Sequence, residues 1–314
     1  MSQTNTSNTS NSNRNDEVRT FIDVYRMIRR VSSMNNKGVN TLVVGMKKEA
    51  ASSSVNRALK SFKSSLYLLE RVSESVKKIA PEIPSQLQMN PSRTLNYCSN
   101  QEGVQDVYIL YNRALQFDTL TDTSPFGIAF YTSIIHFNIG LCHHTKSQLQ
   151  CRGNAKTNTD TDTETYTSTL RKALKHYKKS LKSLRVMLGT HGSNRPPQPG
   201  GGELSIFLKV TALNNLAHVY LQLQEKEKAL RTLTRVFSYV LSHRPALSKV
   251  EACCCEGSSS STASNKNNHS VAEISKDIDV NVDGTPQRNQ NFVREVILNV
   301  VVTTEFPGST GAKA

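Results

Sequence analysis

Apolar residues return at helical spacing in several separate parts of this chain. From residue 55 to residue 76 they recur every three or four positions, which predicts a helix with one apolar stripe. The same rhythm runs from Leu170 to Leu188, and residues 129–144 predict a helix that is apolar on most sides. Shorter apolar patterns at 213–220 and 227–236 predict another helical pair. We therefore expect a mainly all-α fold.

The N-terminal third predicts a lead-in helix followed by a first helical hairpin. Residues 16–34 carry apolar residues at helical spacing behind an acidic start. Residues 37–69 then predict two helices separated by a turn at Gly45. Residues 1–15 hold no apolar residue after Met1, so we expect this stretch to be disordered.

Three stretches of loop composition interrupt the helical pattern. They span residues 80–103, 145–168 and 189–205. Their Pro, Gly, Ser, Thr and Asn content favours loops, and we expect the neighbouring helices to be unaffected by them. The helical domain is then expected over residues 16–243. A Ser- and Asn-rich stretch at 244–291 is expected to be a disordered linker, and 292–314 a C-terminal docking segment and tail.

Two short apolar runs, 104–117 and 292–306, fit both a strand and a helix. The Val, Ile, Tyr and Phe content of the first run favours a strand. The second run could form a last helix or a strand beside the first, and the pattern alone leaves both open.

Two segments align as repeated copies of one helical hairpin. The first helices are Ile135–His144 and Leu213–Tyr220, and the second helices are Leu170–Ser180 and Glu227–Val236. Ala217 and Ala229 are small residues at the places where the two helices of the last hairpin would cross. On these residues the chain resembles the divergent tetratricopeptide-like (TPR-like) helical repeat proteins common in unicellular algae. The resemblance covers residues 37–72 and 129–243.

That resemblance implies a non-catalytic scaffold that binds another protein along a concave groove lined by the first helices. The implied groove residues are Asn138, Asn214, Asn215 and His218. Asn offers both a donor and an acceptor, which suits the main chain or the terminal carboxylate of a peptide. The basic residues that hold a carboxylate in chaperone-binding members are absent from the matching positions Phe137 and Leu141. An alternative is that these Asn side chains bond to neighbouring backbone groups inside the fold.

The net charge of +14 favours acidic partners. Basic residues cover the helix from Leu170 to Leu188 outside its apolar stripe, with no acidic residue between them. The anion-binding candidates are Arg171, Lys175, Lys178, Lys179 and Lys182. They indicate an alternative function, the binding of nucleic acid or an anionic surface. A merely solvated basic face explains the same residues, and the absence of Trp argues against base stacking.

Motifs for catalysis or cofactor binding are absent, so neither an enzyme nor a cofactor is predicted. His136, His143, His144 and Cys142 suggest a metal site at first sight. On a helix, however, only His136 and His143 share a face, so no metal is expected. The role of Cys253, Cys254 and Cys255 is left open.

The sequence contains neither an apolar signal region nor an apolar run of the roughly 18 to 20 residues that span a bilayer. We therefore expect a cytoplasmic or nuclear protein. The sequence names neither the partner nor the cellular process.

Overall fold

The protein is seen here as a computed structural model that describes seven parts of the chain. They are residues 9–46, 51–79, 114–117, 125–154, 160–189, 201–243 and Leu247. The helices are α1 (Thr9–Met46), α2 (Ala51–Ile79), α3 (Pro125–Asn154), α4 (Asp160–Gly189), α5 (Gly201–Gln222) and α6 (Lys226–Ser242). These described parts contain no strand, and the predicted all-α fold is confirmed.

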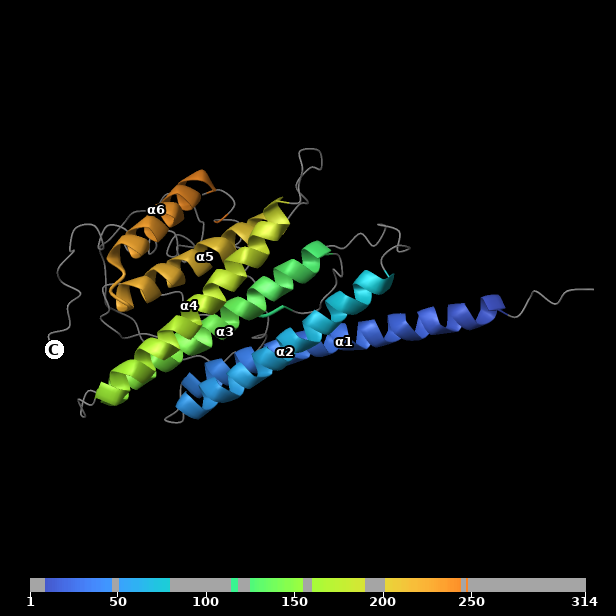
Figure 1. Ribbon diagram of the computed structural model, residues 1–314, viewed down its shortest axis with the longest axis horizontal. Helices are drawn as coiled ribbons and strands as arrows, with labels where there is room; N and C mark the ends of the chain where they lie inside the picture. Colours follow the sequence, from blue (N-terminus) through green and yellow to red (C-terminus); the bar gives the residue numbers. More distant parts are fainter. Residues whose placement is uncertain are drawn as a thin grey trace, which may run out of the picture.

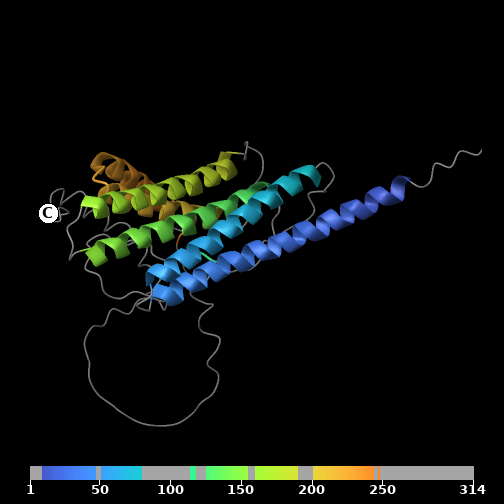
Figure 2. The same ribbon diagram turned by 60° about the horizontal axis from the view of Figure 1, so that its bottom comes forward.

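The six helices form three hairpins, α1–α2, α3–α4 and α5–α6, stacked in chain order. Each helix packs mainly against the helix before it and the helix after it. Figures 1 and 2 show α1 to α4 lying side by side, with α5 and α6 at the opposite end of the stack from α1. The first helices of neighbouring hairpins also touch, α1 with α3 and α3 with α5.

The position of each helix in the stack follows from its apolar pattern. On α2 the predicted stripe is the buried side, with Val55, Phe62, Leu69 and Val76 in the core and the remaining face exposed. The middle of α3 and most of α5 are buried on nearly every side because helices cover them from two directions.

The three hairpins share one pattern of small and large residues. Each first helix has a small buried residue, and each second helix has a buried Ala followed four positions later by a large side chain. The small residues are Gly38, Gly140 and Ala217; the alanines are Ala58, Ala173 and Ala229; the large side chains are Phe62, Tyr177 and Leu233.

The glycines in this pattern give room to the aromatic rings opposite. A Cβ atom at Gly38 would lie 2.7 Å from Cε1 of Phe62, and one at Gly140 would lie 2.9 Å from Tyr177. Both distances are too short for carbon atoms in contact. A glycine therefore accompanies an aromatic residue twice, whereas the third hairpin combines Ala217 with the smaller Leu233.

Several helices are longer than the sequence predicted. The expected lead-in helix at 16–34 and the first helix of the first hairpin are one continuous α1. That helix begins at Thr9, so the prediction of disorder is wrong for residues 9–15, while residues 1–8 lie outside the described parts. Extending an existing helix adds one hydrogen bond per residue and needs no new nucleus, which favours continuation through a polar segment.

The predicted loop at 145–168 is also wrong for most of its length. α3 continues to Asn154 and α4 begins at Asp160, so the insert lengthens both helices of one hairpin. Leu149 on α3 and Tyr166 on α4 pack against the core, and Ser147 is fully buried. Two helices extended together keep a partner for their apolar side chains, which the composition alone does not reveal.

The loop expected at 189–205 is likewise shorter, because α5 already begins at Gly201. In the predicted strand 104–117, only residues 114–117 are described, and they form no strand. The calls on 80–103, 244–291 and 292–314 lie outside the described residues, apart from Leu247. Among the helices that are described, none combines the length and apolar character needed to cross a bilayer.

Replacing Gly38 with Ala should overpack the first hairpin against Phe62. We expect this change to lower the free energy of unfolding by about 1 to 3 kcal/mol, measured by urea denaturation. Combining it with Phe62→Leu reproduces the Ala and Leu pair of the third hairpin and should recover part of the loss. The double-mutant cycle should show a favourable coupling of at least about 0.5 kcal/mol. Strictly additive effects would contradict the size complementarity.

Candidate functional site

Residues 114–117, Ala-Leu-Gln-Phe, lie as a short irregular segment against α1 and α3. Ala114, Leu115 and Phe117 are 2%, 1% and 6% exposed, whereas Gln116 is half-buried. The ring of Phe117 lies 5.0 Å from that of Tyr131 on α3, measured between centroids. We call the surface of α1 and α3 that this segment contacts the first-helix face.

Asn138 on α3 holds the main chain of Leu115 from both sides of its side-chain amide. Its Nδ2 donates to the carbonyl oxygen of Leu115 at 2.8 Å, and its Oδ1 accepts from the Leu115 N–H at 2.8 Å. Nδ2 also donates to Oδ1 of Asn35 on α1 at 3.0 Å. Asn138 therefore joins the segment, α3 and α1 at one buried point.

Asn35 and Asn36 on α1 extend this arrangement along the segment. Asn35 Nδ2 gives the Leu115 carbonyl a second donor at 3.0 Å. Asn36 Nδ2 donates to the Phe117 carbonyl at 2.9 Å, and Asn36 Oδ1 accepts from the Phe117 N–H at 3.3 Å. Two successive odd-numbered residues are thus each held by one amide side chain through both N–H and C=O.

These contacts solve the problem of burying an irregular main chain. A buried N–H or C=O without a partner costs free energy, and in the core such groups are normally paired in helices or sheets. Here Asn side chains take the part that a neighbouring strand would play. Because the amide bonds only to main-chain atoms, this recognition does not depend on the identity of the bound side chain.

The corresponding residue on α5, Asn215, has a different set of partners. Its Nδ2 donates to the hydroxyl of Tyr177 at 3.3 Å, and the same hydroxyl lies 3.4 Å from Nδ1 of His144. His144 Nε2 lies 2.9 Å from Nδ1 of His218. This polar network links α3, α4 and α5 inside the stack. Asn214 is buried as well, with 1% of its surface exposed.

The structure therefore separates the four predicted groove residues. Asn138 contacts the segment, while Asn215 and His218 belong to the inner network and Asn214 is buried on α5. The predictions missed Asn35 and Asn36. A signal for Asn36 was present, because it stands two positions before Gly38 just as Asn138 stands before Gly140. It was overlooked because the first hairpin was taken to start at residue 37.

Three histidines meet between α3 and α4. His136 Nδ1 and His176 Nδ1 are 3.2 Å apart, and the His143 ring stacks on that of His176 with centroids 5.8 Å apart. Burial, and then the charge of Lys179, lower the pKa of His136 to about 4. These side chains are consequently neutral near pH 7.

Burial also dominates the other histidine pKa values. It lowers the pKa of His143 to about 4, with further effects of Lys63, Lys172 and Lys146. The pKa of His176 falls to about 3 through burial, through His136 and His143, and through nearby lysines. Burial alone lowers the pKa of His218 to about 4, and it holds that of His144 well below the ordinary value.

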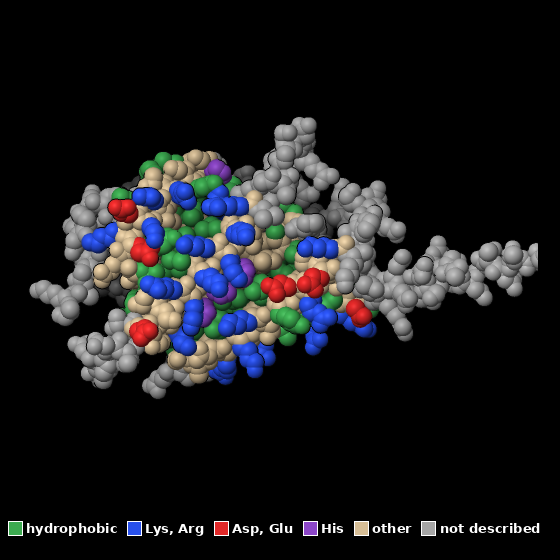
Figure 3. All heavy atoms as spheres, in the orientation of Figure 1, with side chains coloured by type: hydrophobic (Ala, Val, Ile, Leu, Met, Phe, Trp, Pro, Cys, Tyr) green, Lys and Arg blue, Asp and Glu red, His purple; other side chains and the backbone are tan. Residues whose placement is uncertain are grey.

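The predicted anion-binding residues lie on the exposed side of α4, and its apolar stripe is turned inward. Arg171, Lys175, Lys178, Lys179 and Lys182 are all exposed. The ion pairs formed in the described part of the chain belong to α6 and α1 and its neighbourhood, and none involves α4. Figure 3 shows one face of the molecule with many Lys and Arg side chains, few Asp and Glu, and His between them.

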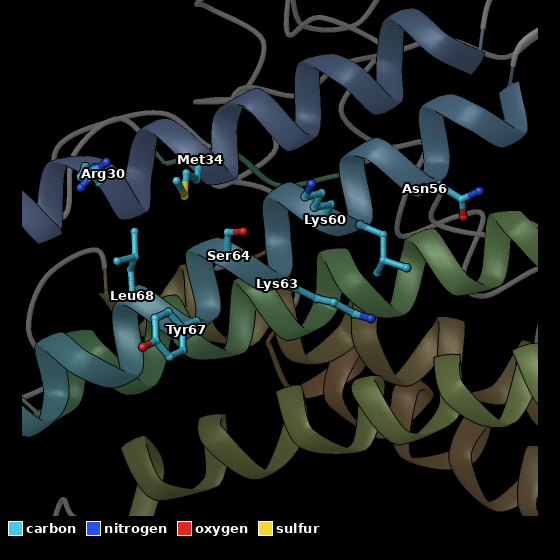
Figure 4. Close-up of a pocket in the computed structure, with 9 residues that line it drawn as sticks. Arg30, Met34, Asn56, Lys60, Lys63, Ser64, Tyr67 and Leu68 are labelled. Atoms are coloured by element: carbon cyan, nitrogen blue, oxygen red, sulfur yellow. The ribbon is translucent and has the colours of Figure 1, made fainter.

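Basic residues of other helices extend this charged surface. Lys63 on α2 and Lys146 on α3 are close enough to His143 to lower its pKa, and Lys146 Nζ donates to Asn56 on α2 at 3.2 Å. An open groove of about 570 Å³ between α1 and α2 is lined by Arg30, Lys60 and Lys63 together with apolar side chains (Figure 4). We call the exposed basic residues of α4, with Lys63 and Lys146, the basic face.

No three His, Cys, Asp or Glu side chains are arranged to hold a metal ion in the parts of the chain that are described. Cys142 is fully buried, and burial raises the pKa of its thiol. Cys151 is exposed, and Cys253, Cys254 and Cys255 lie outside the described residues. Comparisons with protein-family models, with curated proteins and with solved structures found no match to this chain.

The lowered histidine pKa values predict acid sensitivity. In the unfolded chain a histidine titrates near pH 6.5, so between about pH 6.5 and 4 the unfolded state binds more protons than the folded state. The free energy of unfolding should be greatest above about pH 6.5 and fall as the pH is lowered toward 4. Replacing His176 with Gln should flatten this decrease by up to about 1.4 kcal/mol per pH unit. Urea denaturation at pH 7.5, 6 and 5 measures the slope, and an unchanged slope would contradict the assignment.

Proposed function

We propose that this protein is a non-catalytic scaffold that binds an extended segment of another protein along the first-helix face. In this proposal the three hairpins are divergent TPR-like repeats. Support for the repeat assignment comes from the shared small and large positions of the three hairpins and from an Asn two positions before each small residue: Asn36, Asn138 and Asn215.

One observation carries the functional proposal: side chains of two first helices hold the main chain of an extended peptide segment. Asn138 and Asn36 each bond to both the N–H and the C=O of one residue, Leu115 and Phe117 respectively. The same four contacts are open to any extended chain, because every non-proline residue presents the same two groups.

The energetics fit recognition of moderate strength. A hydrogen bond of this kind contributes about 0.5 to 1.5 kcal/mol net, so the asparagines position a peptide more than they bind it tightly. Burial of side chains such as those of Leu115 and Phe117 contributes about 1.5 to 3 kcal/mol each. Affinity then comes from apolar side chains, and orientation from the amides.

Replacing Asn36 and Asn138 with Ala together should weaken binding of the partner, because both two-point main-chain contacts are lost. Proximity labelling in cells, followed by a binding assay with the proteins identified, should show partners that the wild-type chain labels and the double variant does not. We expect an affinity loss of at least about 10-fold, since even two lost net hydrogen bonds amount to about 1 to 3 kcal/mol.

The matched control is Asn56→Ala, which removes an exposed Asn on α2 that bonds only to Lys146 among the printed contacts of that side chain. This control should keep the wild-type partners. Circular dichroism establishes that the variants are folded at the assay temperature. Retention of every partner by a folded Asn36→Ala/Asn138→Ala variant would exclude the first-helix face as the binding surface.

The basic face supports a second candidate function, the binding of nucleic acid or an anionic surface. The observation that favours it is the convergence of uncompensated lysines from α2, α3 and α4 around neutral histidines. Like charges gathered in this way repel one another, and a bound polyanion relieves the repulsion.

Changing Lys175, Lys178, Lys179 and Lys182 to Gln should leave the fold intact, because the buried stripe of α4 is untouched. If this face binds nucleic acid, the slope of log affinity against log salt should flatten by up to about 4 units when each lysine contacts one phosphate. Anionic vesicles serve as the parallel probe for a membrane surface. Unchanged binding to both probes would identify the lysines as a solvated face.

A further inference from the structure

We propose that Ala114–Phe117 is an internal occupant of the first-helix face, and that a partner binds by displacing it with an extended segment of the pattern aliphatic–polar–aromatic. This inference rests on the proposed function and adds its regulation and the kind of sequence bound.

The position of the segment in the chain is the first argument. The connection between α2 and α3, residues 80–124, is 45 residues long, whereas the turns inside the first and last hairpins are residues 47–50 and 223–225. Helix-to-helix connections usually need about 2 to 8 residues. The stack itself therefore does not require a long connection, and part of this one returns to the face that the first helices offer.

The nature of the contacts is the second argument. The segment contributes no helix or strand to the stack, and its main-chain polar groups at Leu115 and Phe117 are bonded by side chains of α1 and α3. A separate peptide in the same extended form would find the same donors and acceptors at the same places. The contacts are those of a ligand that happens to be tethered.

The side chains of the segment define what a competitor must contain. Leu115 and Phe117 are almost fully buried, and Phe117 packs on Tyr131. Gln116 between them is half-buried, and its Nε2 donates to Oδ1 of the exposed Asn40 at 2.8 Å. Ala114 is also buried, which leaves room for a small side chain there. The preferred order is therefore small, aliphatic, polar, aromatic.

A tethered occupant weakens an incoming partner by a calculable amount. Short flexible tethers give effective concentrations on the order of 1 mM. A segment whose free peptide bound with a dissociation constant of about 10 µM would then lower the apparent affinity of a competitor about 100-fold. Regulation follows if the partner carries a stronger segment or if the internal segment is drawn away.

The test supplies the segment in trans to the full chain. The probe is a fluorescein-labelled synthetic peptide with the sequence of residues 111–120, Tyr-Asn-Arg-Ala-Leu-Gln-Phe-Asp-Thr-Leu. In the variant Leu115→Asp/Phe117→Asp the internal segment no longer fits its apolar site. Fluorescence anisotropy should show peptide binding to this variant at least about 10-fold tighter than to the wild-type chain.

Two controls separate specific docking from apolar adhesion. A peptide N-methylated at the Leu residue keeps every side chain but lacks the N–H that Leu115 donates to Asn138, and it should bind at least about 10-fold more weakly. Adding Asn138→Ala to the opened variant should have a similar effect. Equal binding of the plain and N-methylated peptides would overturn the proposal.

Loss of folding in the opened variant is also informative. The milder variant Leu115→Ala/Phe117→Ala is then used, and the thermal midpoint is measured with and without peptide. A rise of the midpoint with peptide supports the proposal, whereas a destabilised chain that peptide does not restore shows that the segment is a fixed part of the core. Peptide binding without any cellular partner would retain this inference and reject the proposed function; partner binding at the first-helix face without peptide binding would do the reverse.

Discussion

Close approach of the two helices in each hairpin sets the register on which the rest of the fold depends. At Gly38 and Gly140 the opposing ring leaves no space for a Cβ atom, so only one alignment of the two helices is possible there. The Asn two positions earlier is then carried to a fixed place on each first helix. The amides that hold Leu115 and Phe117 are thus positioned by packing on the opposite side of the same helices.

The fold was largely predictable because helical stripes are a local property. The stripe on α2 and that on α4 were identified from spacing alone, and both are buried as expected. The lengths of α3 and α4 were not predictable in this way. Residues 145–154 and 160–168 are helical because Leu149 and Tyr166 find apolar neighbours across the hairpin, and composition gives no sign of that contact.

The candidate site was only partly predictable for a related reason. Asn138 was identified from its distance to Gly140, whereas the segment that it holds was expected to be a strand because of its β-branched and aromatic residues. The hydrogen bonds from Asn35 and Asn36 to that segment join residues 80 or more positions apart in the chain. No periodicity connects positions so distant, and β propensity measures a preference for extended backbone without saying what will pair with it.

The two candidate surfaces differ in the physics of recognition. The first-helix face uses neutral amides and buried apolar side chains, whose contribution changes little with ionic strength. The basic face uses exposed lysines, whose effect is screened within about 10 Å at 0.1 M salt. Between them lie histidines that burial keeps neutral near pH 7, so that no further positive charge is added to a surface that already lacks acidic partners on α4. A ligand of the first-helix face therefore has to match shape and main-chain geometry, whereas a ligand of the basic face has only to carry enough negative charge.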